Sequence, residues 1–259
     1  MFAKFKINIE DVRKVNASSR SGIGRNMNSY ILTESCTNVL RELLENEQGI
    51  IDGEKLKKEY FPTKDKKKFN VFISHSHGDI NEIEKFAQTL EEKYGVTCFV
   101  DSMVWKNIAT LQKKIDNRYS RAEDGKLDYQ LIQQSTAHIH SLLSIALFEM
   151  IDQCECCIFV QSDKSLALDF NDTQTLSPWI YEEIYYMNHT REQSLQRLED
   201  RYSKVLNERR YFDASIKMTH VVDLSGFKTL FPYYFDNTLK GEDFLTRLYV
   251  RHNIIQALW

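Results

Sequence analysis

The chain has 259 residues, of which 42% are hydrophobic and 27% charged, with a formal net charge of −3. This length and apolar content suffice for a packed core, so a largely disordered chain is excluded. The slightly acidic balance disfavours a general electrostatic grip on nucleic acid. With only 9 Gly and 3 Pro, collagen-like and linker-rich architectures are excluded as well.

Membrane insertion and secretion are not expected from the sequence. The longest apolar run, 141–150, is about half of the roughly 20 residues that a membrane-spanning helix needs. The charged N-terminus has no apolar segment of the kind found in secretory signals. Five cysteines are an odd number, and most lie in apolar contexts typical of reduced, buried thiols. These features predict a cytoplasmic protein without a membrane partner.

Residues 1–65 are interpreted as an N-terminal extension of unknown role, and 66–259 as the main α/β domain. The extension contains a strand-like start, a polar loop and two segments with helical spacing, at 5–9, 16–25, 37–45 and 52–60. A lysine-rich bridge at 63–68 precedes the first strong strand pattern and sets the expected boundary.

The main domain opens with a pattern typical of a βαβ unit. An apolar run at 69–74 and a second at 96–100 predict two strands, and the spacing over 80–94 predicts the helix between them. Asp79 is the expected cap of this helix and Gly95 its expected stop. Because two strands joined through a helix run in the same direction, the sheet is predicted to be parallel.

The remaining sequence continues the alternation of strands and helices. Pro178 suits a first helical turn, with Ser177 as its cap. The predicted elements are helices at 108–117, 135–152, 178–187, 191–208 and 240–258, and strands at 156–161 and 218–224. This order predicts an open, doubly wound parallel sheet, in which ligands bind beyond the carboxyl ends of the strands.

Three segments in this order resemble prokaryotic TIR (Toll/interleukin-1 receptor) domains, of the kind found in antiphage systems such as Thoeris. They are Phe69–Asp79 (FNVFISHSHGD), Gly95–Ser102 (GVTCFVDS) and Ser177–Ile184 (SPWIYEEI). The resemblance covers 69–187 well and 218–259 loosely, and it implies a flavodoxin-like sheet. The segment 105–135 is longer than the corresponding part of a typical family member, so the loop that gates the site is expected to differ.

The resemblance implies an enzyme that cleaves NAD at the nicotinamide–ribose bond and releases a linear, cyclic or conjugated ADP-ribose product. The family's catalytic glutamate lies four residues after the tryptophan of the third segment, which here is Glu183 after Trp179. NAD is then the substrate, with no cofactor and no metal. Expected partners are other copies of the domain and an effector that binds the product. The expected substrate-binding residues are Phe72, Ser74, His75, Ser76, Asp101, Ser102, Trp105 and Trp179.

Physical chemistry supports the same reaction independently of the resemblance. Nicotinamide leaves NAD as a neutral molecule from a cationic precursor, so no general acid is needed. The transition state resembles an oxocarbenium ion, as in glycoside cleavage. A carboxylate near the ribose stabilises the charge that develops there.

Three alternatives remain open. The first is a non-catalytic TIR scaffold that signals through protein contacts, and the second is a nucleoside deoxyribosyltransferase-like enzyme. The third is a dinuclear zinc hydrolase, because His75, His77 and Asp79 imitate part of its signature, but Ile80 stands where a further histidine is required. Cys156 and Cys157 point to opposite sides of a strand and are interpreted as core residues.

Overall fold

The computed structural model describes residues 1–18, 51–60, 69–100, 102–167, 174–191, 194–199, 202–204, 220–236 and 238–257. The predicted helix at 37–45 lies outside these ranges, as do most of the loop at 16–25 and the bridge at 63–68. The chain divides into two compact units. One contains Met1–Tyr30, Lys68–Val100 and Ile151–Trp259, and the other contains Ile31–Lys67 and Asp101–Met150.

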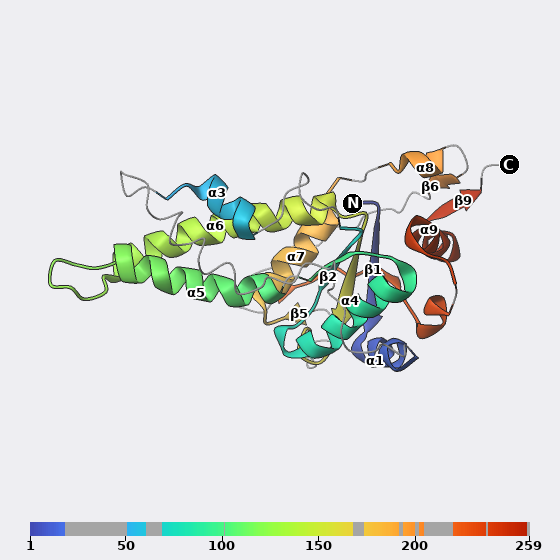
Figure 1. The fold of residues 1–259 in the computed structure, drawn as a ribbon, viewed down its shortest axis with the longest axis horizontal. Coiled ribbons are helices and arrows are strands. Elements are labelled where there is room, and N and C mark those ends of the chain that lie inside the picture. Colours follow the sequence, from blue (N-terminus) through green and yellow to red (C-terminus); the bar gives the residue numbers. More distant parts are fainter. Residues whose placement is uncertain are drawn as a thin grey trace. The chain divides into compact units, whose positions relative to one another are not determined.

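The first unit is built on a five-stranded sheet in the order β3-β2-β4-β1-β8 (Figure 1), and each neighbouring pair in it is parallel. This confirms the predicted class, an open α/β fold with a parallel sheet flanked by helices. The predicted strands at 69–74, 96–100 and 156–161 are all present. The strands are β1 (Ala3–Asn8), β2 (Val71–Ser74), β3 (Cys98–Val100), β4 (Cys156–Gln161) and β8 (Lys228–Thr229).

Strand β1 comes from the segment that the sequence analysis placed outside the main domain. It pairs with β4 along its whole length, from Ala3 opposite Cys156 to Asn8 opposite Gln161, and β8 pairs on its other side. Its alternating pattern buries Phe5 and Ile7 completely. The strand-like start is therefore an inner strand of the sheet, and the boundary expected after residue 65 does not separate it from the other strands.

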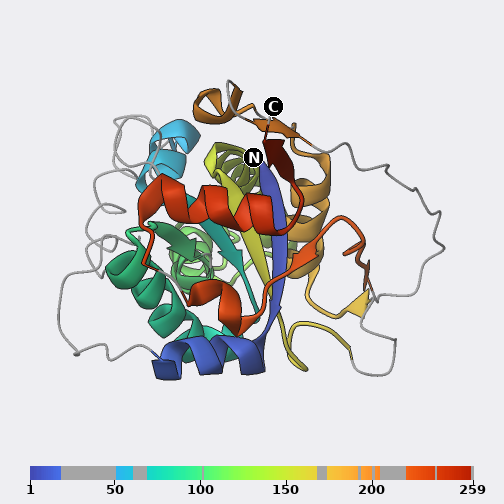
Figure 2. The same ribbon diagram turned by 90° about the vertical axis from the view of Figure 1, so that its right-hand side faces the viewer.

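Helices cover both faces of the sheet (Figure 2). Helices α1 (Ile9–Ser18), α4 (Ile80–Tyr94) and α9 (Gly241–Arg251) share one apolar core with the sheet residues Phe5 and Ile73. Helix α7 (Pro178–His189) lies on the opposite face.

Of the two predictions for the ends of α4, the one for its C-terminal end is confirmed and the one for its N-terminal cap is not. Helix α4 ends at Gly95 as predicted, because a φ of 64° suits glycine best. Asp79, the expected cap at its start, makes no capping hydrogen bond from its side chain. That part of the prediction is wrong, since the Asp79 carboxylate is bonded to Ser162 and Lys164 instead.

The C-terminal third departs from its predicted elements. In the predicted strand at 218–224 the described residues form only β7 (His220–Val221), which pairs antiparallel with β5 (Gln174–Thr175) in a separate sheet. The predicted helix at 191–208 is not continuous: its described parts contain the short helix α8 (Gln196–Glu199) and strand β6 (Tyr202–Lys204).

The predicted terminal helix at 240–258 is too long. Helix α9 ends at Arg251, and Asn253 then adopts a φ of 52°. Strand β9 (Ile255–Ala257) follows and pairs antiparallel with β6. The apolar residues Ile254 and Ile255, which suggested a continuing helix, are buried in the core from this extended segment.

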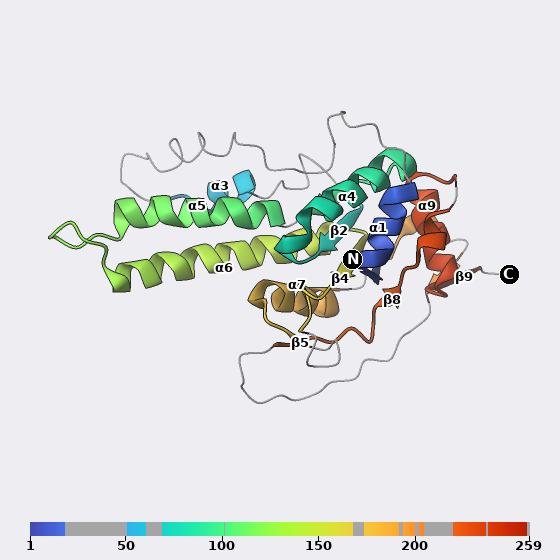
Figure 3. The same ribbon diagram turned by 90° about the horizontal axis from the view of Figure 1, so that it is seen from below.

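The second unit is helical in its described residues. Helix α3 (Gly53–Tyr60) matches the segment predicted at 52–60, while α5 (Ser102–Tyr119) and α6 (Tyr129–Gln153) exceed their predicted bounds. Figure 3 shows α5 and α6 side by side, and Gln112 Nε2 donates a hydrogen bond to Ser135 Oγ at 2.9 Å between them. Among the described helices, none has both the length and the apolar character needed to cross a membrane.

Candidate functional site

The first and third sequence segments meet at one hydrogen bond. Ser74, the last residue of β2, donates from Oγ to Glu183 Oε2 at 2.5 Å. Both residues are fully buried, with an exposed fraction of 0%. Because β2 ends at Ser74, the contact lies at the carboxyl end of the sheet, where ligands bind in open α/β folds.

Helix α7 presents Glu183 to the sheet through its local sequence. Ser177 Oγ accepts a hydrogen bond from the Ile180 amide at 3.3 Å, and Pro178 occupies the first turn, as predicted. The buried residues of α7 are Ile180, Glu183, Ile184 and Met187, a spacing that places them on one helix face. Glu183 thus occupies an otherwise apolar stripe.

Cys157 lies close enough to Glu183 for the carboxylate charge to act on its thiol. Burial is the main cause that raises the pKa of the Cys157 thiol well above its usual value, and the charge of Glu183 acts in the same direction. In the register, Cys157 pairs with Phe72 of β2 and with Lys4 of β1. The side chains of these three residues therefore point to the face that α7 covers.

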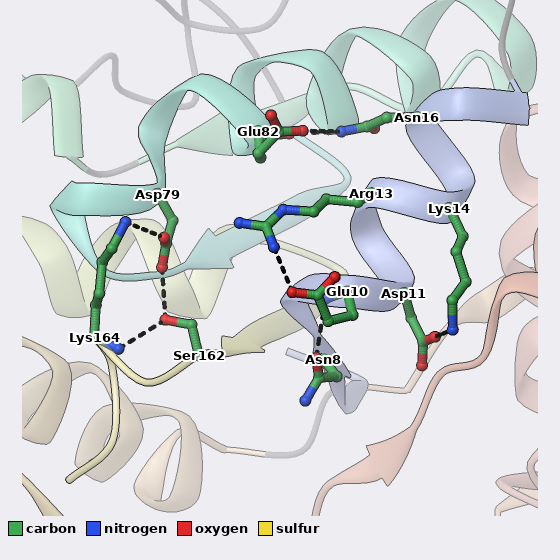
Figure 4. Close-up of polar contacts among 10 residues, drawn as sticks. All are labelled: Asn8, Glu10, Asp11, Arg13, Lys14, Asn16, Asp79, Glu82, Ser162 and Lys164. Carbon is green, nitrogen blue, oxygen red and sulfur yellow. Dashed lines mark hydrogen bonds and ion pairs between the residues drawn. The ribbon is translucent and has the colours of Figure 1, made fainter. Parts of the chain in front are cut away.

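A polar cluster ties the loop after β2 to the loop after β4 (Figure 4). Asp79 ends the short 3-10 helix η1 (His77–Asp79) and accepts hydrogen bonds from Ser162 Oγ at 2.6 Å and Lys164 Nζ at 2.9 Å. Lys164 Nζ also donates to the Gly78 carbonyl at 2.7 Å. The Asp79 side chain is 4% exposed, so this ion pair has a buried acidic partner.

Hydrogen bonds continue from this cluster to the start of α7. The Ser162 amide donates to Ser165 Oγ at 2.8 Å, and Thr175 Oγ1 donates to the Ser165 carbonyl at 2.8 Å. The Ser177 amide then donates to Thr175 Oγ1 at 3.1 Å. The helix that carries Glu183 is therefore connected to the loop after β2 by a chain of polar contacts.

Apart from Asp79 and Ser177, the members of this chain were not predicted individually. Ser162, Lys164, Ser165 and Thr175 lie in the polar stretch 162–178 after a predicted buried strand, and such loops border the ligand side of a parallel sheet. That position predicts the stretch as part of the site, but its composition does not indicate which of its residues make the contacts.

The other predicted site residues have separate placements. Phe72 is fully buried, and its ring stacks on Phe99 with centroids 5.8 Å apart. His75 is buried, with Nδ1 3.4 Å from the Ile73 carbonyl oxygen. Ser76 is partly buried, and its backbone carbonyl accepts a hydrogen bond from the Asp79 amide at 2.9 Å. Trp179 is partly buried in the first turn of α7.

The second sequence segment contributes less to the described site. Asp101 lies outside the described residues. Ser102 and Trp105 belong to α5, but their side chains lie outside the described part of the structure. The roles predicted for these three residues stay predictions.

The residues of the zinc alternative make other contacts. In the described ranges, no group of three or more His, Cys, Asp or Glu side chains is arranged to hold a metal ion. The Asp79 carboxylate is bonded to Lys164 and Ser162 as described above, and His77 is exposed to solvent.

No protein-family model, curated protein or solved structure matches this chain. The interpretation of the site therefore depends on its residues and their geometry. That geometry provides a buried carboxylate at the carboxyl end of a parallel sheet, oriented by a serine of the inner strand β2.

Proposed function

We propose that this protein is a TIR-like enzyme that consumes NAD by cleaving the nicotinamide–ribose bond, with Glu183 as the catalytic carboxylate. Its product is an ADP-ribose derivative, linear, cyclic or conjugated, that serves as a signal in antiviral defence in the cytoplasm. An effector that binds this product acts downstream.

One observation supports this proposal above the others: the hydrogen bond of 2.5 Å from Ser74 Oγ to Glu183 Oε2. Ser74 belongs to the first segment that resembles the family and Glu183 to the third, and 109 positions of sequence separate them. A chance resemblance of two unrelated segments gives no reason for them to meet at the ligand end of the sheet.

In this mechanism Glu183 stabilises the charge of the ribose as nicotinamide departs. A carboxylate fixed in orientation before the reaction loses little energy to reorganisation when the oxocarbenium-like charge develops. The Ser74 hydroxyl supplies this orientation by holding one carboxylate oxygen. Water, or a nucleophile within the ADP-ribose itself, then attacks the ribose carbon and determines whether the product is linear or cyclic.

The complete burial of Glu183 implies a further requirement. A carboxylate that is 0% exposed cannot contact a ribose until the surrounding side chains open. We therefore propose that activity requires a trigger such as self-association, which would also protect the host from continuous loss of NAD.

The direct test is to incubate the assembled protein with NAD and measure the release of nicotinamide. The Glu183→Gln variant should lose at least about 100-fold in rate, the loss typical when one preorganised electrostatic contact to a transition state is removed. Glutamine keeps the size of the side chain and an oxygen that can accept the Ser74 hydrogen bond, so the fold should persist.

Glu182 provides a matched control on the same helix. Its carboxylate accepts a hydrogen bond from Tyr186 Oη at 2.7 Å and lies outside the buried stripe of α7. Glu182→Gln should release nicotinamide at the wild-type rate. Equal rates for the wild type and Glu183→Gln would contradict the assignment of Glu183.

A non-catalytic scaffold is the second candidate, and exposed apolar groups around α7 favour it. Tyr181, Tyr185, Leu176 and Val221 are exposed large hydrophobic residues on α7 and the adjoining β5 and β7 region. Such groups can mediate contacts between domains. A protein that self-associates but releases no nicotinamide under any condition of assembly would be this scaffold.

A further inference from the structure

Strand β1 brings two lysines to the sheet face that carries the proposed site. Alternation along the strand directs Lys4 and Lys6 away from the core face of Phe5 and Ile7. Lys4 Nζ donates a hydrogen bond to Asn188 Oδ1 of α7 at 2.7 Å. This contact shows that the lysine side of β1 is the side covered by α7.

Lys6 lies at the same level of the sheet as Ser74. Ser74 of β2 pairs with Phe159 of β4, and Phe159 pairs with Lys6 of β1. Two strand spacings amount to about 10 Å between the backbones of Ser74 and Lys6. The serine that holds Glu183 and the lysine thus stand in one row across the α7 face, near the carboxyl end of the sheet.

No acidic side chain in the described structure forms an ion pair with Lys6. Lys6 is partly buried, and within the described ranges its ammonium forms no hydrogen bond or ion pair. Lys4, two residues earlier, differs because Asn188 holds its ammonium. A partly buried cation on an inner strand, without a counter-charge, favours the binding of an anion.

Near this end of the sheet, Glu183 accepts a hydrogen bond from Ser74, and three further acidic residues are paired with cations other than Lys6 (Figure 4). In the first turn of α1, Glu10 pairs with Arg13 and Asp11 with Lys14. Asp79 pairs with Lys164, as described above. These acids are therefore committed to partners other than Lys6.

We infer that Lys6 binds a phosphate group of a nucleotide ligand at the carboxyl end of the sheet, on the face that α7 covers. Lysine binds phosphate as a point charge. In a nucleotide the phosphate is attached to the ribose. Glu183 near the ribose and Lys6 about two strands away would therefore contact neighbouring groups of one ligand. That the ligand is a dinucleotide such as NAD rests on the proposed function, whereas the phosphate-binding role of Lys6 does not.

The test measures binding of inorganic pyrophosphate, ADP-ribose and adenosine by calorimetry, with the full chain and its Lys6→Met variant. Loss of a charged contact should weaken pyrophosphate and ADP-ribose binding by about tenfold or more. Adenosine, which has no phosphate, should bind both proteins equally. Lys6→Arg should restore most of the affinity, and added salt should weaken binding to the wild type more than to Lys6→Met.

Lys14→Met is the matched control, because Lys14 is an exposed lysine on α1 whose ammonium pairs with Asp11 at 2.7 Å. It should bind pyrophosphate as the wild type does. The inference is overturned if the wild type does not bind pyrophosphate, or if Lys6→Met binds it equally well. Pyrophosphate binding that depends on Lys6 without any NAD cleavage would retain this inference and reject the proposed function. NAD cleavage with an unchanged KM in Lys6→Met would reject this inference and retain the proposed function.

Discussion

Two buried glutamates lie near opposite ends of the parallel sheet and are held in different ways. Glu155 precedes β4 at the amino end, where Arg197 grips both carboxylate oxygens, at 3.0 and 2.5 Å, and Tyr249 Oη donates to it at 2.6 Å. Glu183 lies at the carboxyl end, where the serine hydroxyl of Ser74 orients it. The comparison distinguishes a carboxylate that joins several elements of the fold from the one to which we assign the proposed chemistry.

The contacts of Glu155 join three parts of the first unit. Arg197 belongs to α8, Tyr249 to α9, and the Glu155 carbonyl accepts the Phe2 amide at 2.6 Å at the start of β1. Burial is the main cause that raises the pKa of Tyr249 well above its usual value, so its hydroxyl remains a donor. This end of the sheet is thus stabilised by a charged cluster in which Arg197 and Tyr249 both donate to the Glu155 carboxylate.

The largest effect on stability is expected from Glu155→Gln. Removing one partner of a buried ion pair leaves the Arg197 guanidinium without its compensating charge, which typically costs about 3–5 kcal/mol. The free energy of unfolding, measured with urea, should fall by this amount. Glu242→Gln is the matched control, since Glu242 is 65% exposed and lies 3.7 Å from Arg197 Nε. A similar loss in both variants would contradict the structural role of Glu155.

Ser74→Ala should have a smaller effect on stability and a specific effect on activity. Loss of a hydrogen-bond donor to a buried carboxylate lowers the free energy of unfolding by about 1–3 kcal/mol. Nicotinamide release should fall further than the change in folded population explains, because Glu183 loses its orientation. Ser74→Thr, which restores a hydroxyl, should recover part of the rate. Full activity in Ser74→Ala would show that the hydrogen bond from Ser74 to Glu183 has no part in catalysis.

Acid should destabilise the fold through His252, which follows the helix that carries Tyr249 and whose ring packs against Phe5 of β1. Burial and the positive charge of Lys228 lower the pKa of His252 from 6.5 to about 4. Its neutral form is favoured in the folded state, so this contribution to stability is complete above pH 6.5 and is lost as pH falls toward 4. Since the side chain is partly exposed, we expect a loss of about 1–2 kcal/mol.

Urea unfolding at several values of pH checks this expectation. His252→Gln should remove the part of the pH dependence that falls between 6.5 and 4. His138→Gln, a change to an exposed histidine of α6, should leave the dependence as in the wild type. An unchanged slope in His252→Gln would exclude His252 as its source.

The smallest effect is expected from Lys164→Met at the carboxyl end. Lys164 is 56% exposed, so solvent screens its ion pair with Asp79, and the buried Asp79 keeps its hydrogen bond from Ser162 in the variant. We therefore expect a loss of about 1 kcal/mol. A loss as large as that of Glu155→Gln would mean that the two ends of the sheet do not differ in the way described. Thermal and urea unfolding of the two variants side by side measures the difference.

Local sequence patterns predicted the elements whose signals are contained in a few neighbouring residues. The apolar run of β4, the helical spacing of α4 with Gly95 after it, and the Ser177–Pro178 start of α7 were all predicted from such patterns. The segment at 191–208 was predicted incorrectly because its charged spacing suits a helix, while the β6 residues within it pair with β9, more than 50 positions away.

For the candidate site, sequence alone selected Glu183 and Ser74 through their resemblance to family motifs and predicted the edge of the sheet where they lie. It could not establish that they meet, that Asp79 bonds to Lys164, or that β1 lies between β4 and β8 with Lys6 on the α7 face. Strand order and contacts between distant segments depend on which surfaces bury each other when the chain closes. No pattern within a single strand or helix contains that information.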